Sequence, residues 1–195
     1  MEKTFHSSNS KVPPSEGFRE AYILHLADNT LILSQRNAEW CGHGPILEQD
    51  IAITNISLDL IGQARNFYQY AAQLINKSHI IGSSKAPSPK GEGIGGEVNE
   101  DSLAYLRTER EFKNCLLVEQ SNGDWAQTTL RQFLFSAYQF LLYQSLLSIK
   151  DEKLAAIAEK SLKEVRYHLR WSSEWVVRLG DGTKESHSRM LNAID

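Results

Sequence analysis

The 195-residue sequence contains little cysteine, no excess of basic residues and no leader-like apolar segment near its start, and each absence excludes a class of protein. Its two cysteines, Cys41 and Cys115, are far apart and form no CxxC pair, which excludes a disulfide framework or zinc ribbon and favours a reducing, cytoplasmic compartment. Lys and Arg number 21 against 24 Asp and Glu, a net charge of −3, so no nucleic-acid partner is expected. Residues 1–15 lack the apolar core of a signal peptide and are expected to form a flexible tail.

One long stretch lacks formal charge and raises the question of a membrane span. Residues 132–149 contain no Asp, Glu, Lys or Arg over 18 positions. The stretch nevertheless contains Gln132, Gln139 and Gln144, whose amides are costly in lipid but can form hydrogen bonds inside a helical bundle. We therefore expect a buried helix of a water-soluble bundle and no membrane partner.

The sequence also lacks the clean apolar–polar alternation of strands, and helical periodicity dominates. Four long helices are expected, spanning about 16–38, 45–76, 125–149 and 151–179. Short turns at residues 41–44 and just before residue 151 join them into two pairs. Pro45 suits the first turn of the second helix, and Asp124 suits the N-cap of the third.

A long connection separates the two helix pairs. Within it, residues 82–97 are rich in Gly, Pro, Ser and charge, so they are expected to form a disordered loop, and residues 101–120 are expected to form a shorter helix. One long crossover between antiparallel helix pairs is typical of ferritin-like folds. The sequence therefore predicts an all-α, ferritin-like four-helix bundle whose crossover carries an extra helix, with residues 16–195 as a single domain. An irregular all-α bundle is the alternative.

A ferritin-like bundle suggests a specific test, because its di-iron sites use a Glu from each of two helices and Glu-x-x-His from the other two. Asp28 and Asp59 lie at similar distances before and after the first turn, so we expect them to meet across the first helix pair. As buried groups they need partners, and Arg36 or Arg65 could pair with them. A ligand histidine would be expected three residues after Asp59, but that position is Gly62. The second helix therefore supplies one ligand fewer than a di-iron site needs. A mid-helix glycine costs about 1 kcal/mol, so another group is expected to approach closely there.

The second pair lacks acidic ligands on one of its helices. The fourth helix offers Glu164 and, on the same face, His168, which could chelate a metal ion or form a satisfied core pair. The third helix has no Asp or Glu between residues 125 and 150, and a complete di-iron ligand set cannot be assembled. We expect no metal and no catalytic residue in this chain, and interpret the following residues as a degenerate metal-site seam: Asp28, Asp59, Gly62, Gln132, Glu164 and His168.

Several longer segments resemble one known family, the C subunits (PaaC) of the phenylacetate-CoA oxygenases, also called phenylacetyl-CoA 1,2-epoxidases. The matching segments are SQRNAEWCGHGP at 34–45, DLIGQARN at 59–66, LVEQSNGD at 117–124, KEVRYHLR at 163–170 and WVVRLGDGT at 175–183. The likeness extends over about 18–79 and 100–194. The loop 82–97 looks inserted relative to the family, and family sequences continue for some tens of residues beyond the position of Asp195.

The resemblance implies a ferritin-like, structural subunit that pairs with a homologous catalytic A subunit and with other members of the complex. In that family the di-iron centre lies in the A subunit, and a reductase subunit delivers electrons from NADPH. The complex uses dioxygen to convert phenylacetyl-CoA to its ring epoxide. The resemblance thus implies that the chain itself holds no cofactor, which agrees with its incomplete ligand set.

A basic stripe on the fourth helix could serve such a complex. Lys163, Arg166 and Arg170 lie on one face and could contact the phosphates of the acyl-CoA substrate or an acidic face of a partner. A solvated helix face is the structural alternative.

Two other functions are also open: a carboxylate-bridged metal oxidase that uses Asp28, Asp59, Glu164 and His168, and a truncated scaffold remnant.

Overall fold

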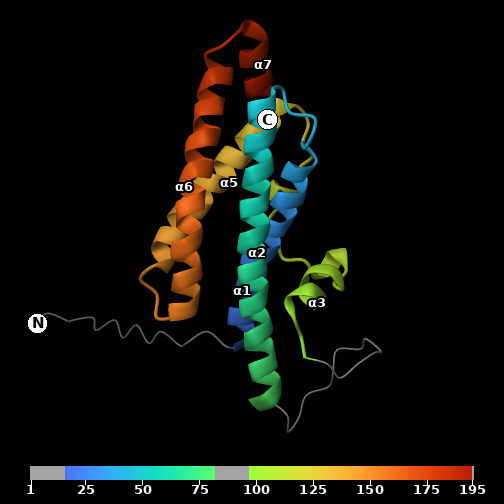
Figure 1. Ribbon diagram of the computed structural model, residues 1–195, viewed down its shortest axis with the longest axis vertical. Coiled ribbons are helices and arrows are strands. Elements are labelled where there is room, and N and C mark those ends of the chain that lie inside the picture. The colour runs from blue at the N-terminus through green and yellow to red at the C-terminus, as the bar shows by residue number, and fades with distance from the viewer. Residues whose placement is uncertain (1–15, 82–96, 195) are drawn as a thin grey trace, which may run out of the picture.

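The computed structural model describes residues 16–81 and 97–194, and all regular structure in these ranges is helical (Figure 1). The elements are α1 (Glu16–Ala38), α2 (Leu47–Ile81), α3 (Glu100–Tyr105), the 3-10 helix η1 (Glu109–Glu111), α4 (Leu116–Glu119), α5 (Trp125–Leu146), α6 (Glu152–Gly180) and α7 (Lys184–Asn192). The expected all-α class is confirmed. The expected tail 1–15 lies outside the described residues, as does the expected loop apart from residue 97.

The four long helices match the sequence-based prediction except at their ends. α2 begins at Leu47, two residues after Pro45, and α5 ends at Leu146. Asp124 is the N-cap of α5, where its carboxylate accepts hydrogen bonds from the backbone N–H groups of Ala126 and Gln127. α7 was not predicted from the sequence, and its start is fixed by the N-cap Thr183.

The expected helix over residues 101–120 is wrong. α3 ends at Tyr105, and the chain then forms only η1 and α4. The reason lies in Asp28 of α1, which accepts hydrogen bonds from the Arg107 side chain and from the backbone N–H of Lys113. A backbone N–H that bonds to α1 cannot also continue an uninterrupted helix, so the buried charge of Asp28 is satisfied at the cost of helical structure in the crossover.

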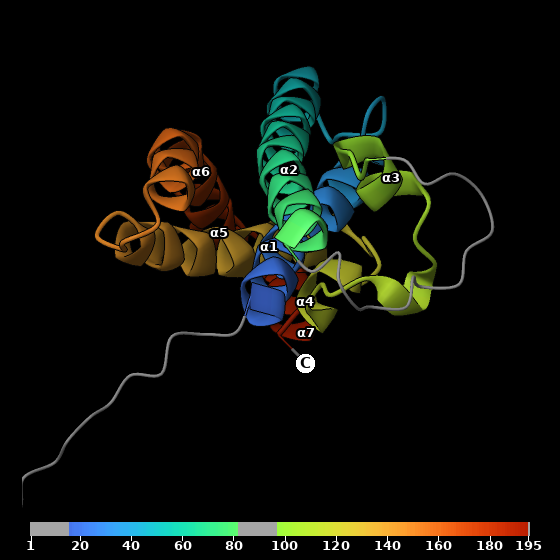
Figure 2. The same cartoon turned by 90° about the horizontal axis from the view of Figure 1, so that it is seen from below.

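The long helices pack as two antiparallel pairs, α1 with α2 and α5 with α6, and α2 also packs against α6 (Figures 1 and 2). Two serines form hydrogen bonds between α1 and α2. Ser34 Oγ donates to the Ser57 carbonyl oxygen at 2.8 Å, and Ser57 Oγ donates to the Ser34 carbonyl oxygen at 2.7 Å. These reciprocal bonds bring the α1 and α2 backbones close together and fix their register.

Apolar side chains from all four helices fill the interior. Its largest fully buried members are Tyr68, Tyr143, Phe67, Phe135, Ile23, Leu33, Ile53, Ile56 and Leu60. No helix in the described part of the chain is long and apolar enough to cross a membrane.

Candidate functional site

A row of polar side chains runs through this apolar interior, between α1, α2, α5 and α6. We call it the polar seam and define it by its members, which are Asn37, Asp59, Gln63, Gln132, Ser136, Gln139, Tyr143, Glu164 and His168. All are buried except Asp59 and Glu164, which are partly exposed. Polar groups this deep in a protein require hydrogen-bonding partners, and the seam supplies most of them from its own members.

One end of the seam joins α2, α5 and α6 around Gln63. The Gln63 amide donates to Glu164 Oε2 at 2.9 Å, and its carbonyl oxygen accepts from Gln139 Nε2 and from the Tyr143 hydroxyl, both at 3.2 Å. Gln139 also donates to the Tyr143 hydroxyl at 2.9 Å. A neutral amide therefore links the carboxylate on α6 to the polar groups on α5.

The α5 side of the seam is neutral along its whole length. Asn37 of α1 donates to Gln132 Oε1 at 2.7 Å, and Gln132 Nε2 donates to Ser136 Oγ at 2.9 Å. Gln132 is fully buried. Its two amide atoms are thus both used in hydrogen bonds, as expected for a group that connects helices.

His168 is fully buried, and its partner is Asp59 of α2. His168 Nε2 lies 2.9 Å from Asp59 Oδ2. Because an ionised carboxylate only accepts hydrogen bonds, the proton of this bond is carried by Nε2. The predicted core pair of His168 with Glu164 is therefore wrong, since Glu164 bonds to Gln63 instead.

Glu164 lies in an environment that disfavours its charge. Its pKa is raised, chiefly by burial and also by the nearby charge of Asp59, while the hydrogen bond from Gln63 and the neighbouring His168 act in the opposite direction. Asp59 and His168 thus act in opposite directions on the pKa of Glu164.

Asp28 belongs to a different cluster. Its fully buried carboxylate pairs with Arg107, whose Nη1 donates to Oδ2 at 3.1 Å and whose Nη2 donates to Oδ1. Tyr68 Oη donates to Oδ1 at 2.6 Å, and the Lys113 backbone N–H donates to Oδ2 at 2.7 Å. Burial and the hydrogen bond to Asp28 raise the pKa of Tyr68, which keeps its hydroxyl proton in place as a donor.

The expectation that Asp28 meets Asp59 is wrong. The two carboxylates have separate partners on different elements. Neither predicted arginine pairs with them. Arg36 bonds to Glu39 just beyond α1, and Arg65 bonds to Glu100 on α3. Asp28 instead recruits an arginine from the crossover, some 79 positions along the chain.

Gly62 lies on the exposed side of α2, and a Cβ atom built there would meet nothing within 4 Å. The expected close neighbour is therefore not provided by any described part of this chain. The reason is its angular position, because Asp59 and Gln63 point toward α6 whereas Gly62 points away from it.

The side chains of the seam do not fit a di-iron centre. Such a centre needs carboxylates from all four helices and two histidines, whereas α5 contributes only neutral groups and the charge of Asp28 is matched by Arg107. Among the residues that the structure describes, no group of three or more His, Cys, Asp or Glu side chains is arranged to hold a metal ion.

The predicted basic stripe is exposed on α6. Lys163, Arg166 and Arg170 form no ion pair with another described residue, and the Arg170 guanidinium lies over the Tyr167 ring at 5.9 Å. The stripe is available to solvent or to a partner.

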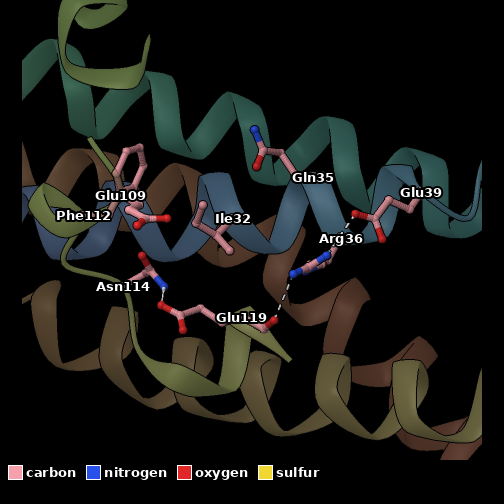
Figure 3. Close-up of a pocket in the computed structure, with 8 residues that line it drawn as sticks. All are labelled: Ile32, Gln35, Arg36, Glu39, Glu109, Phe112, Asn114 and Glu119. Carbon is pink, nitrogen blue, oxygen red and sulfur yellow. Dashed lines mark hydrogen bonds and ion pairs between the residues drawn. The ribbon is translucent and has the colours of Figure 1, made fainter. Parts of the chain in front are cut away.

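A surface hollow of about 450 Å³ lies where the crossover meets α1 (Figure 3). It brings together two of the segments singled out in the sequence, 34–45 and 117–124. Arg36 connects them by donating to the Glu119 carbonyl oxygen, and it also donates to Glu39 within its own segment. The close-up shows three carboxylates, those of Glu39, Glu109 and Glu119, around this hollow.

Two arginines that sequence patterns did not single out anchor the crossover. Besides Arg107, the buried Arg131 of α5 donates to the Gln120 carbonyl oxygen and to Asn122 Oδ1, both at 2.6 Å. Burial lowers the pKa of Arg131 to about 10. An arginine inside an otherwise uncharged helix was the available signal, because a lone charge in an apolar stretch needs a partner in the fold.

Comparisons with known proteins agree with this picture. The C subunit of the 1,2-phenylacetyl-CoA epoxidase of Escherichia coli (strain K12) is 49% identical over 175 residues, which are 90% of this chain and 62% of that relative. The chain therefore spans less than two thirds of the length of this relative. The family described as phenylacetic acid catabolic protein (PaaA_PaaC) matches residues 13–195. These matches confirm the resemblance carried by the sequence motifs, and the chain belongs to the phenylacetic acid catabolic protein family.

Proposed function

We propose that this chain is a non-catalytic, structural subunit of a multicomponent di-iron oxygenase that epoxidises the ring of phenylacetyl-CoA. Its fold would be a ferritin-like bundle, and its work would be to pair with the catalytic A subunit in the cytoplasm. The chemical class of the substrate follows from the name of the Escherichia coli relative.

The observation that carries the proposal is the neutral side of the polar seam. Where a di-iron protein needs carboxylates, α5 has Gln132, Ser136 and Gln139, and these groups bond to one another and to amides on α1 and α2. Amides and hydroxyls bind iron poorly compared with carboxylates and imidazoles. The seam therefore suits a role in holding helices in register.

Catalysis would then reside in a partner. In this proposal the A subunit holds the di-iron centre, and a reductase subunit supplies electrons from NADPH. Exposed surfaces on this chain, including the basic stripe, would face partner subunits or the phosphates of the acyl-CoA near an interface.

Co-expression with the A subunit tests the proposal. We expect a stable one-to-one complex on a sizing column at micromolar concentration. When phenylacetyl-CoA, dioxygen, NADPH and the reductase subunit are supplied, we expect epoxidation by the complex but by neither subunit alone. A Glu164→Gln variant of this chain should leave the turnover of the complex unchanged, because its carboxylate has no chemical role.

Two results would contradict the proposal. Separation of the subunits on the column would remove the pairing role. Turnover abolished by Glu164→Gln, with folding and pairing intact, would favour a metal oxidase that uses Asp28, Asp59, Glu164 and His168.

A further inference from the structure

The outward face of α2 carries an apolar stripe that the described chain leaves uncovered. Leu47, Ile51, Leu58 and Ile61 are all exposed, although they lie on one of the most deeply packed helices of the molecule. Single exposed apolar residues are normal on proteins, but a contiguous row of large ones marks an interaction surface.

The spacing of this stripe matches a helical partner. Together with Thr54, the residues Leu47, Ile51, Leu58 and Ile61 recur at intervals of four, three, four and three. This is the a and d pattern of a helix that packs lengthwise against another helix. The stripe extends over about 21 Å of helix, at roughly 1.5 Å per residue.

The same face of α2 is covered farther along by this chain's own crossover. Ala72 is buried and belongs to the same apolar cluster as Leu103 of α3, with Val98 packed against it. Figure 1 shows α3 beside the C-terminal half of α2 only. The described part of the chain thus covers one half of this face with a helix and leaves the other half open.

A groove continues the stripe toward α3. It has a volume of about 400 Å³ and is lined by Leu58, Ile61, Gly62, Ala104 and Tyr105, among others. Tyr105 and its neighbour Leu106 are exposed at the end of α3. We call the whole surface the α2 face and define it by Leu47, Ile51, Leu58, Ile61 and Tyr105.

Gly62 gives a second reason to expect a closely packed partner. It lies in the groove, and nothing in the described chain comes within 4 Å of where its Cβ would be. A glycine in a helix interior costs stability, yet no contact within the described chain requires it here. A backbone that approaches from outside would require it.

The charges around the α2 face are acidic and indicate the chemistry of the partner. Glu100 and Asp101 line the groove, Glu48 is exposed next to Leu47, and the basic residue that lines the groove, Arg65, is paired with Glu100. A two-fold contact between two copies would place these acids against each other, which is unfavourable. A partner with Lys or Arg beside its apolar seam would complement them.

We infer that the α2 face is the docking surface for an amphipathic helix of the A subunit, with an apolar a and d seam flanked by basic residues. This inference rests on the proposed function, because it locates the contact that the proposed pairing needs. It also explains why a chain rich in buried hydrogen bonds leaves five large apolar side chains exposed on one surface.

Paired double variants of the full chain test the inference. Leu58 and Ile61 are 62% and 43% exposed, and Leu141 and Leu134 on α5 are 65% and 45% exposed, which makes the second pair a matched control on a different helix. We expect L58D/I61D to raise the Kd for the co-expressed A subunit at least thirtyfold, which corresponds to the loss of one interface hot spot. We expect L134D/L141D to leave the Kd within about threefold of the unsubstituted chain.

The outcomes separate the inference from the proposed function. If the unsubstituted chain binds the A subunit and L58D/I61D binds equally well, the α2 face is not the docking surface and the proposed pairing stands. If the unsubstituted chain does not bind, the pairing itself fails. Two further results would overturn the inference. One is sedimentation of the unsubstituted chain as a dimer that L58D/I61D dissociates. The other is a fall in the Tm of isolated L58D/I61D that exceeds the fall for isolated L134D/L141D, which carries a similar cost in helix propensity, because the excess would mean that the chain itself covers the face.

The charge of the partner is tested separately. An E48K/D101K variant should slow association with the A subunit about tenfold at low salt and by less at high salt, because complementary charges mainly accelerate encounter. The control E152K/E159K reverses two exposed acids of α6. An equal effect of both variants would contradict a basic flank opposite the α2 face.

Discussion

Asp28 and Asp59 occupy similar positions on either side of the first turn, yet their carboxylates differ in burial and in the number of groups that bond to them. The Asp28 side chain is fully buried and faces a guanidinium, a hydroxyl and a backbone N–H. The Asp59 side chain is 37% exposed and bonds to a single buried imidazole. The difference teaches that burial determines how much compensation a carboxylate needs, because water still solvates Asp59 but cannot reach Asp28.

The sharpest test of this comparison removes the cation beside Asp28. Arg107→Met should lower the free energy of unfolding by about 3–5 kcal/mol, because it leaves a buried charge unpaired. Urea denaturation measures the loss. The control Arg65→Met removes an exposed partner of Glu100 and should cost less than about 1 kcal/mol. Equal losses in the two variants would show that Asp28 does not depend on its arginine.

Removing the Asp59 carboxylate should have a smaller effect. Asp59→Ala leaves the buried Nε2–H of His168 without its partner, which should cost about 1–2 kcal/mol. The exposed Asn55 lies on the same helix, so Asn55→Ala should change stability by less than about 0.5 kcal/mol in a parallel denaturation series. A loss as large as that of Arg107→Met would contradict the role assigned to solvent exposure.

A substitution at Gly62 should stabilise the isolated chain, in contrast to the two substitutions above. Gly62→Ala should raise the stability of the isolated chain by about 0.5–1 kcal/mol, because the site is helical and has room for a methyl group. Thermal unfolding measures this gain. Gly123 is the contrasting position, since its φ of +54° and its contact with Gln127 both disfavour a side chain, so Gly123→Ala should lower the Tm. A destabilised Gly62→Ala would mean that the chain itself fills the space beside Gly62.

The smallest expected effect is the pH dependence from Glu164. Because its pKa is raised in the folded protein, the folded state binds more protons than the unfolded state between the two pKa values, and stability falls as pH rises through that window. Glu164→Gln should remove this slope and raise stability near pH 7 by less than about 1 kcal/mol. Asp151 is the internal contrast, because its pKa is lowered by Tyr70, by the Leu154 N–H and by Arg19 despite partial burial.

The pH dependence of stability that comes from Asp151 has the opposite sign to that from Glu164. Its stabilisation is present above the unfolded pKa and is lost as pH falls through the folded pKa. Asp151→Asn should therefore lower stability at neutral pH and reduce the sensitivity to acid. NMR titration of the two carboxyl carbons checks both directions, and a lowered pKa for Glu164 would contradict the environment described for it.

The long helices could be predicted from the sequence because their signals are local. Apolar periodicity, the Gly-containing turn at 41–44 and the Asp124 N-cap each act within a few residues. The crossover was mispredicted because its structure depends on a distant residue. Nothing near Arg107 shows that the chain must unwind there to reach Asp28, 79 positions away.

The polar seam was predictable in composition but not in pairing. The acid-free stretch 125–150 and the acids on the other helices are visible in the sequence, and they led to Gln132, Glu164 and His168. Which groups bond to one another depends on the rotation of each helix about its axis. That rotation is set by tertiary packing, so Asp59 bonds to His168 and Gln63 bonds to Glu164.

The polar seam, as we interpret it, holds helices together instead of holding iron. The most direct measurement is the iron content of the purified chain after anaerobic loading with ferrous ion and desalting, with a mononuclear iron-binding protein as the positive control. We predict background iron only, and the same result for a Glu164→Gln variant. A content near two irons per chain, the stoichiometry of a di-iron centre, lost in Glu164→Gln, would contradict this interpretation and assign the seam a catalytic metal site.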